Sequence, residues 1–306
     1  MFYEYAVEPK AVGSNWHTCR YIIEKFGFDR GRLISEFPGR WLREAYDATL
    51  NLPDMEKKRV VEALASARMK LVRSSRQYDP AAGDWLFNAL KEHGRQPFRG
   101  IIAYQNSGKS HDVMTAGELD EHSPQMIVAT SVAVPRDATS MSTALEAFLT
   151  HGSRIAFVDP YFNLFNQKYK STLKQCLLVA AAKNPKAECE IHYRFHEKNV
   201  EPTDIEKSAC SAFSGLIPAG IIVKVFCWRQ KEGGEDFHAR YLLTDKGGVG
   251  VEAGFSAEGK NETTDMHLLE LGLCKARLDM FTPPSTTFDL VGPVLSVDAS
   301  GKVKHV

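Results

Sequence analysis

The stretch Asp236-Phe-His-Ala-Arg-Tyr-Leu-Leu-Thr-Asp245 decides the interpretation of the C-terminal half of this chain. Its pattern predicts a β-strand over residues 237–243. Because alternate residues of a strand share a face, we expect His238 and Arg240 to project side by side. A guanidinium binds phosphate oxygens and an imidazole exchanges protons near neutral pH, so the pair suits an anionic ester.

The segments around this stretch alternate between helix and strand. Helices are predicted over residues 142–150, 169–182 and 204–216, and strands near 154–158, 189–195 and 220–226. This order predicts an α/β fold with a mostly parallel sheet flanked by helices, whose functional groups gather at strand ends. Asp159, directly after a strand, is therefore a pocket candidate, although Asp159-Pro160 also suits a plain strand end.

The spacing of His238, Arg240 and Asp245 resembles the signature of the phospholipase D superfamily: His-x-Lys, four residues, Asp, then a small-residue segment that ends with Asn. His238 and Asp245 match in type and spacing, while Arg240 stands where that family has lysine. Gly254-Phe-Ser256 looks like the small-residue segment. Glu258 occupies the asparagine position, and Asn261 is the substitute nearby. The resemblance covers roughly residues 140–279 and is to single-motif members.

This resemblance implies a metal-independent phosphodiesterase, in the first place a nuclease, that works through a phospho-histidine intermediate. His238 would be the nucleophile, and Asp245 would be the carboxylate that fixes its tautomer. Arg240, Ser256 and Asn261 would bind the phosphate. No metal and no cofactor is implied. The family uses two histidines, so a single motif implies a homodimer in which each subunit contributes one.

Two alternatives stay open. The first is a catalytically inactive phospholipase D-like module that binds phosphate-containing ligands or a protein partner, which the arginine in place of lysine favours. The second is an internal second motif at His192-Tyr-Arg194, with Asn199 at the carboxylate position. The two-part layout also resembles bacterial antiphage defence proteins, which would imply a partner in a defence complex.

The N-terminal half predicts a different architecture. We expect residues 1–134 to form a mainly helical region with a small β segment, and residues 135–306 to form the phospholipase D-like domain. Large apolar residues recur at helical spacing between residues 15 and 69, and β-like runs follow at 100–104 and 126–130. The polar helix faces are rich in Arg and Lys, which suits either solvated faces or nucleic-acid binding.

Composition limits the functional classes. Hydrophobic residues make up 43% and charged residues 25%, and Lys+Arg equals Asp+Glu at 38 each, so nucleic-acid binding would need a local basic patch. Six cysteines without a C-x-x-C pair predict reduced thiols in a core. Met1-Phe-Tyr-Glu-Tyr lacks the pattern of a secretory signal, and no apolar run is long enough to span a membrane. These features predict a cytoplasmic protein.

Overall fold

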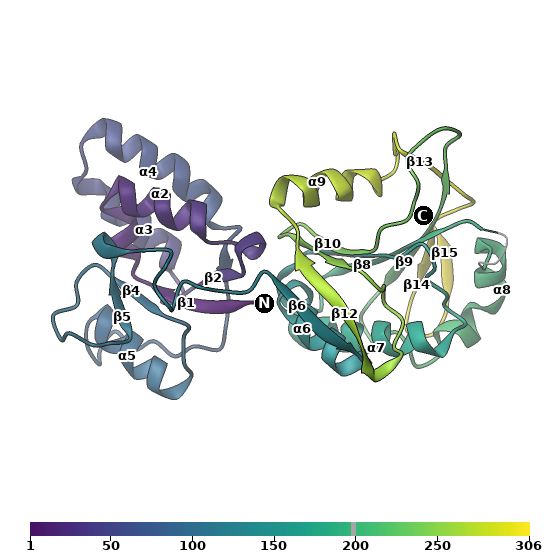
Figure 1. The fold of residues 1–306 in the computed structure, drawn as a ribbon, viewed down its shortest axis with the longest axis horizontal. Coiled ribbons are helices and arrows are strands. Elements are labelled where there is room, and N and C mark those ends of the chain that lie inside the picture. Colours follow the sequence, from purple (N-terminus) through teal and green to yellow (C-terminus); the bar gives the residue numbers. More distant parts are fainter. Residues whose placement is uncertain (197–199) are drawn as a thin grey trace. The chain divides into compact units, whose positions relative to one another are not determined.

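The computed structural model describes residues 1–196 and 200–306. Its internal contacts divide the chain into two compact units, Met1–Thr130 and Ser131–Val306 (Figure 1). The predicted boundary, between residues 134 and 135, falls inside strand β6 (Ser131–Arg136). Because β6 pairs with a strand of the second unit, the division lies just before it.

The first unit is an α/β structure built on a five-stranded parallel sheet in the order β3-β2-β1-β4-β5. Its strands are β1 (Tyr3–Val7), β2 (Arg32–Ser35), β3 (Leu71–Val72), β4 (Ile101–Ala103) and β5 (Val113–Thr115). A parallel sheet needs cover on both faces. The helices provide it: α1 (Pro9–Gly13), α2 (Trp16–Lys25), α3 (Trp41–Ala48), α4 (Asp54–Ala67) and α5 (Trp85–Arg95), with short 3₁₀ turns η1 (Phe28–Arg30), η2 (Thr49–Asn51) and η3 (Ala116–Glu118).

The alternation of side chains along β1 separates the two cores of this unit. Tyr5 and Val7 pack with Trp41 and other residues of the α1–α4 side, whereas Ala6 packs with Trp85 of α5. Figure 1 shows α5 on the opposite side of the sheet from α2, α3 and α4. The unit is therefore a three-layer arrangement with the sheet in the middle.

The prediction of a mainly helical N-terminal region with a small β segment missed the five-stranded sheet on which the helices pack. The four residues of β2 were counted within a helical run because Leu33 and Phe37 are four apart, but α3 begins only at Trp41. The run at 100–104 does form β4, whereas the run at 126–130 forms no strand. Strands this short carry too few residues for an alternating pattern to show.

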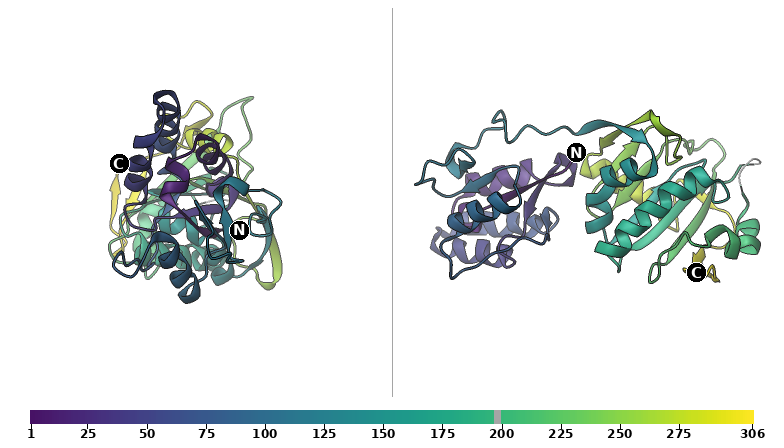
Figure 2. Two further views of the ribbon diagram at one scale, coloured as in Figure 1. Left: turned by 90° about the vertical axis from the view of Figure 1, so that its left-hand side faces the viewer. Right: turned by 90° about the horizontal axis from the view of Figure 1, so that it is seen from below.

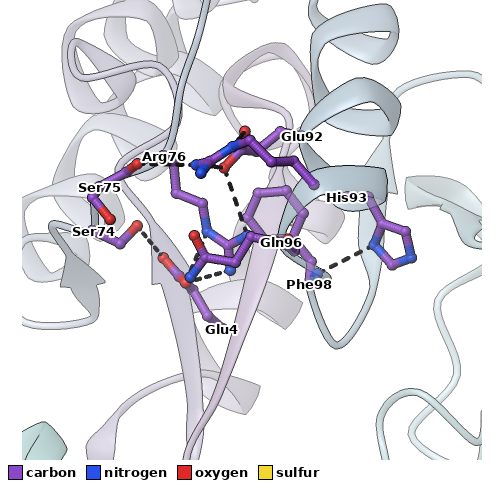
Figure 3. A network of polar contacts seen from close by, with 9 residues as sticks. Glu4, Ser74, Ser75, Arg76, Glu92, His93, Gln96 and Phe98 are labelled. Carbon is purple, nitrogen blue, oxygen red and sulfur yellow. Dashed lines mark hydrogen bonds and ion pairs between the residues drawn. The ribbon is translucent and has the colours of Figure 1, made fainter.

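A buried arginine fixes the connection between β3 and α5 (Figure 3). The Arg76 side chain is 4% exposed, and its Nε and Nη2 donate to the Glu4 carboxylate of β1 at 3.0 and 2.6 Å. Its guanidinium lies 3.8 Å from the ring centroid of Phe98 and 3.9 Å from Glu92. Arg76 therefore joins the connection, the central strand and α5 in one network.

The second unit contains a ten-stranded sheet in the order β15-β14-β9-β8-β7-β10-β11-β12-β6, with β13 paired to β9. Among the described residues of this unit, β7, β8 and β9 run parallel to one another, and the other pairings are antiparallel. The sheet is thus mixed, and the prediction of a mostly parallel sheet is wrong. Its remaining strands are β7 (Arg154–Val158), β8 (Glu188–Arg194), β9 (Val223–Gln230), β10 (Tyr241–Thr244), β11 (Gly248–Val251), β12 (Gly259–Leu268), β13 (Phe288–Leu290), β14 (Leu295–Val297) and β15 (Val303–His305).

Helices cover both faces of this sheet. Helices α6 (Ala138–His151) and α7 (Gln167–Lys183) lie side by side on one face, and α9 (Leu271–Met280) lies on the other (Figures 1 and 2). Helix α8 (Pro202–Phe213) follows β8. Trp228 is fully buried on the α9 side, and Trp41 is fully buried in the core of the first unit. Of the six cysteines five are buried, while Cys210 is exposed, so the prediction of core thiols holds for five.

Candidate phosphate-binding site

Arg240 and Asp159 come together at one edge of the second unit's sheet. Strands β7 and β10 are antiparallel with Tyr241 opposite Val158, so the residue before β10 meets the residue after β7. The Arg240 Nε lies 3.9 Å from the Asp159 Oδ1. This edge holds the carboxyl ends of the parallel strands β7 and β8, where ligands of α/β sheets bind.

The Arg240 guanidinium is fixed on one side and free on the other. Its Nη1 donates to the Glu252 carbonyl oxygen at 2.9 Å, and its Cζ lies 5.3 Å from the ring centroid of Tyr161. Within the described part of the chain, Nη2 makes no hydrogen bond. Arg240 is therefore held in place with donors left for an anion, as the predicted phosphate-binding role requires.

Asp159 is a buried carboxylate that accepts hydrogen bonds from two loops. It is 1% exposed, its Oδ1 accepts from the Tyr161 N–H at 2.9 Å, and its Oδ2 accepts from the Phe255 N–H at 3.0 Å. Burial raises the pKa of the Asp159 carboxyl, while these N–H donors and the nearby Arg240 oppose that rise. Asp159 thus belongs to the candidate site, and it positions the small-residue segment.

Gly254 lets this segment approach the carboxylate. Its φ is +74°, a left-handed conformation, and a Cβ placed there would lie 2.3 Å from the Asp159 Oδ2 and 2.9 Å from the Arg240 Cδ. Only glycine fits such a position without displacing its neighbours.

Ser256 is held by an arginine from the far end of the sheet. The Arg136 Nη2 donates to the Ser256 Oγ at 2.5 Å and lies 3.7 Å from Glu258. The buried Arg136 Nε has no hydrogen-bond partner among the described residues. Tyr169 lies near Ser256 as well, and burial raises the pKa of Tyr169 to about 12. We call Asp159, Arg240, Arg136 and Ser256 the cluster. Ser256 is 7% exposed, so its hydroxyl reaches a ligand only if that ligand enters the cluster.

The start of α7 borders the same cluster. The Ala257 N–H donates to the Lys168 carbonyl oxygen at 3.1 Å, and the Lys168 ammonium pairs with Glu258. Helix N-termini favour anions because their N–H groups and dipole are positive. Three arginines lie at this edge, and each faces a carboxylate: Arg136 lies 3.7 Å from Glu258, Arg194 lies 3.0 Å from Asp236, and Arg240 lies 3.9 Å from Asp159.

His238 lies outside regular secondary structure, because β10 begins only at Tyr241. Its side chain is exposed, and neither ring nitrogen is hydrogen-bonded to a residue that the structure describes. The predicted strand therefore does not extend to His238, although the residue remains two positions from Arg240. An exposed imidazole with free nitrogens is accessible to a ligand or to a second copy of the chain.

Asp245 is not placed to orient His238 in the same chain. Its Oδ1 accepts hydrogen bonds from the backbone N–H groups of Ser153 at 2.6 Å and Arg154 at 3.3 Å. Asp245 follows the last residue of β10, so extended strand geometry separates it from Arg240 by roughly 16 Å. The expected role in fixing a tautomer does not fit this position, because an extended strand carries its two ends apart.

Two other predicted positions lie outside the cluster's contacts. Asn261 is exposed on β12, and its side chain makes no hydrogen bond with a described residue. His192 of the internal second motif is fully buried between aromatic rings, with its Nε2 3.1 Å from the Glu190 Oε2, while Asn199 lies outside the described residues. His192 therefore has no access to a substrate.

Sequence reasoning missed several members of the cluster. Arg136 was not expected at this site, and its partner Ser256 lies 120 positions away. Arg194 was considered only within the internal motif, yet its guanidinium lies 5.5 Å from the Tyr161 ring and its Nη1 donates to Asp236 at 3.0 Å. Their shared signal was a position at a strand end, which does not by itself say which ends meet.

No group of three or more His, Cys, Asp or Glu residues within 1–196 and 200–306 is arranged to hold a metal ion. Among the helices described, none has both the length and the apolar character to cross a bilayer.

Comparisons with known proteins place few limits on this chain. No family model matches it, and no curated protein matches it. Among solved structures, it is similar to TrmBL2, described as an archaeal chromatin protein with a novel mode of DNA binding. The two share 12% identity with a TM-score of 0.29, and the match covers 50% of this chain and about half (51%) of that one.

Proposed function

We propose that the second unit binds a phosphodiester at the Arg240 edge and cleaves it without a metal ion, as a nuclease. The observation that carries the proposal is the pairing of a fixed guanidinium, Arg240, with an accessible imidazole, His238, two residues away. Arg136, Lys168 and the α7 N-terminus add positive charge for the phosphate.

In the proposed reaction, a neutral ring nitrogen of His238 attacks phosphorus, so that a P–N bond forms and one P–O ester bond breaks. The leaving oxygen takes a proton from a second histidine. That histidine then removes a proton from water, which displaces His238 and releases a phosphomonoester. Because the motif supplies one histidine, the second histidine would be His238 of another copy of the chain, as in a twofold dimer.

A second candidate is a phosphate-binding module without turnover. It is favoured by one observation, the position of Asp245 on the backbone of Ser153 and Arg154, which leaves the His238 tautomer unfixed within one chain. In this case Arg240 binds the ligand and His238 is dispensable.

The two candidates are separated by incubating the chain with DNA and RNA in EDTA. The nuclease proposal expects cleavage that His238→Ala abolishes and a covalent protein–phosphate adduct after rapid acid quenching. The binding proposal expects no cleavage, with ligand affinity lost in Arg240→Ala and retained in His238→Ala. Tyr3→Ala, a change in the other unit, controls for general effects of substitution.

A further inference from the structure

We propose that the ligand of this edge is single-stranded nucleic acid, which runs across the ends of β9, β8, β7 and β10 and stacks its bases on Tyr161 and Phe195. The cleavage of that strand rests on the proposed function, but the binding does not. The proposal stands on an alternation of guanidinium groups and aromatic rings along this edge.

The first part of the alternation lies beside Asp159. Tyr161 follows β7, and its ring centroid lies 5.3 Å from the Arg240 guanidinium and 5.5 Å from the Arg194 guanidinium. Tyr161 is 41% exposed, in contrast to Phe98, which is 4% exposed and has the Arg76 guanidinium 3.8 Å from its ring centroid. The exposed face of Tyr161 can therefore receive a base while the arginines meet the flanking phosphates.

The second part continues on the neighbouring strands. Phe195 directly follows Arg194 at the end of β8, and its N–H donates to the Trp228 carbonyl oxygen of β9 at 2.7 Å. The Arg229 guanidinium lies 4.6 Å from the Phe195 ring centroid. Phe195 is half-buried, while Arg229 is exposed. This backbone hydrogen bond fixes the main chain of Phe195 at the ends of β8 and β9, so its side chain starts from this edge.

These residues lie at the ends of neighbouring strands and form one row, which we call the track. Strands β9, β8, β7 and β10 are adjacent in that order, and they carry Arg229, Arg194 with Phe195, Tyr161 and Arg240. At about 4.8 Å between strands, the track spans roughly 14 Å. A chain of nucleotides with alternating phosphates and bases matches an alternation of cations and rings over such a distance.

A single strand fits this track better than a duplex. In a duplex the base faces are already stacked on one another, so exposed rings have nothing to bind except at an end or a flipped base. A single strand offers every base face. Phe165, 43% exposed in the loop that follows Tyr161, adds a third ring close in sequence.

The test measures fluorescence anisotropy of labelled oligonucleotides in EDTA, with His238→Ala as the background so that no strand is cleaved. The probes are oligothymidylate, an abasic oligonucleotide of equal length and a matching duplex. We expect oligothymidylate to bind about 5- to 100-fold more tightly than the abasic strand, and Tyr161→Ala to reduce that ratio by a similar factor. Tyr3→Ala is the matched control, because Tyr3 is 39% exposed and has the Arg99 guanidinium 5.0 Å from its ring.

Equal affinity for oligothymidylate and the abasic strand, or tighter binding of the duplex, overturns the track. A loss of the ratio in Tyr3→Ala as large as that in Tyr161→Ala also overturns it. Wild-type cleavage of both the normal and the abasic strand, absent in His238→Ala, would then leave the proposed nuclease intact. Base-dependent binding without cleavage by the wild type would support the track and contradict the proposed nuclease activity.

Discussion

The Asp245 carboxylate accepts a hydrogen bond from the Ser153 backbone N–H at 2.6 Å, across 92 positions of sequence. Asp245 follows β10, and Ser153 precedes β7, so this contact aligns the two antiparallel strands at the end opposite His238. The carboxylate that best matches a catalytic motif in the sequence thus has a structural role in the fold.

The first prediction tests whether Asp245 has a structural or a catalytic role. Asp245→Ala leaves two backbone N–H groups without their acceptor and should lower the free energy of unfolding of the second unit by about 1–3 kcal/mol. Urea unfolding followed by Trp fluorescence measures this loss. His238→Ala, at an exposed side chain, should leave stability within about 0.5 kcal/mol. A stable Asp245→Ala variant that binds substrate but does not cleave it would instead restore the catalytic role.

The second prediction concerns Gly254. Gly254→Ala places a Cβ 2.3 Å from the Asp159 Oδ2 and should both destabilise the unit and weaken phosphate binding. Gly215→Ala is the matched control, because Gly215 has a similar φ of +63° with no atom within 4 Å of an added Cβ. The control should cost about 1–2 kcal/mol for the left-handed backbone alone. An equal loss in both variants, from chemical denaturation, would show that the Asp159 contact is unimportant.

The third prediction concerns the Arg76 network. Arg76→Ala removes the ion-pair partner of Glu4 and one partner of the 2%-exposed Glu92, and should destabilise the first unit by about 3 kcal/mol. Arg73→Ala is the control, since Arg73 pairs with Glu36 at an 86%-exposed side chain and should change stability by less than about 1 kcal/mol. Calorimetry would detect the loss as a shift of one transition. Similar small effects of both variants would argue against the network.

The fourth prediction is a pH dependence from His192. Burial lowers the pKa of His192 below its usual value of 6.5, with Glu190 opposing this and Arg154 adding to it. Below pH 6.5 the unfolded imidazole takes up a proton that the folded one does not, so stability falls as the pH drops from about 6.5 to 5, by at most about 1.4 kcal/mol per pH unit. The pKa of Glu190 is also lowered, but its contribution is lost only below about its usual 4.5.

His192→Gln should therefore flatten the slope of the free energy of unfolding against pH in this window, whatever its effect on stability at neutral pH. Urea titrations at several pH values measure the slope. His17→Gln, at an exposed histidine, serves as the control. A variant slope as steep as that of the wild type would assign the pH dependence to other groups.

The sequence was sufficient for the α/β class of the second unit, because β7, β8 and the helices α6 and α7 carry long, regular patterns. It was insufficient for strand direction, since a short run such as β10 reads the same whether it pairs parallel or antiparallel, and since β12 is mostly polar. In the first unit, the run at 100–104 predicted β4, but the two-residue β3 is too short to distinguish from a loop, and β1 became visible only through its pairing with β2 and β4.

The sequence predicted the central residues of the candidate site but not those at its margin. Arg240, Ser256 and Asp159 were expected from motif spacing and strand ends, and the structure places the three in one cluster. Arg136 could not be expected there, because its contact depends on β6 pairing with β12 at the far side of the sheet. Motif spacing also misassigned Asp245, since a residue count does not show how far an extended strand separates Asp245 from Arg240.

The central place of β1 affects how the first unit is made. Glu8, after β1, accepts from the Tyr104 N–H, after β4, and the two residues are 96 positions apart. At about 5–20 residues per second, ribosomal synthesis leaves β1 without its second neighbour for about 5–20 s. During that interval the nascent chain carries an open strand edge in the middle of its future sheet, so translation speed and chaperone access should influence the yield of folded protein.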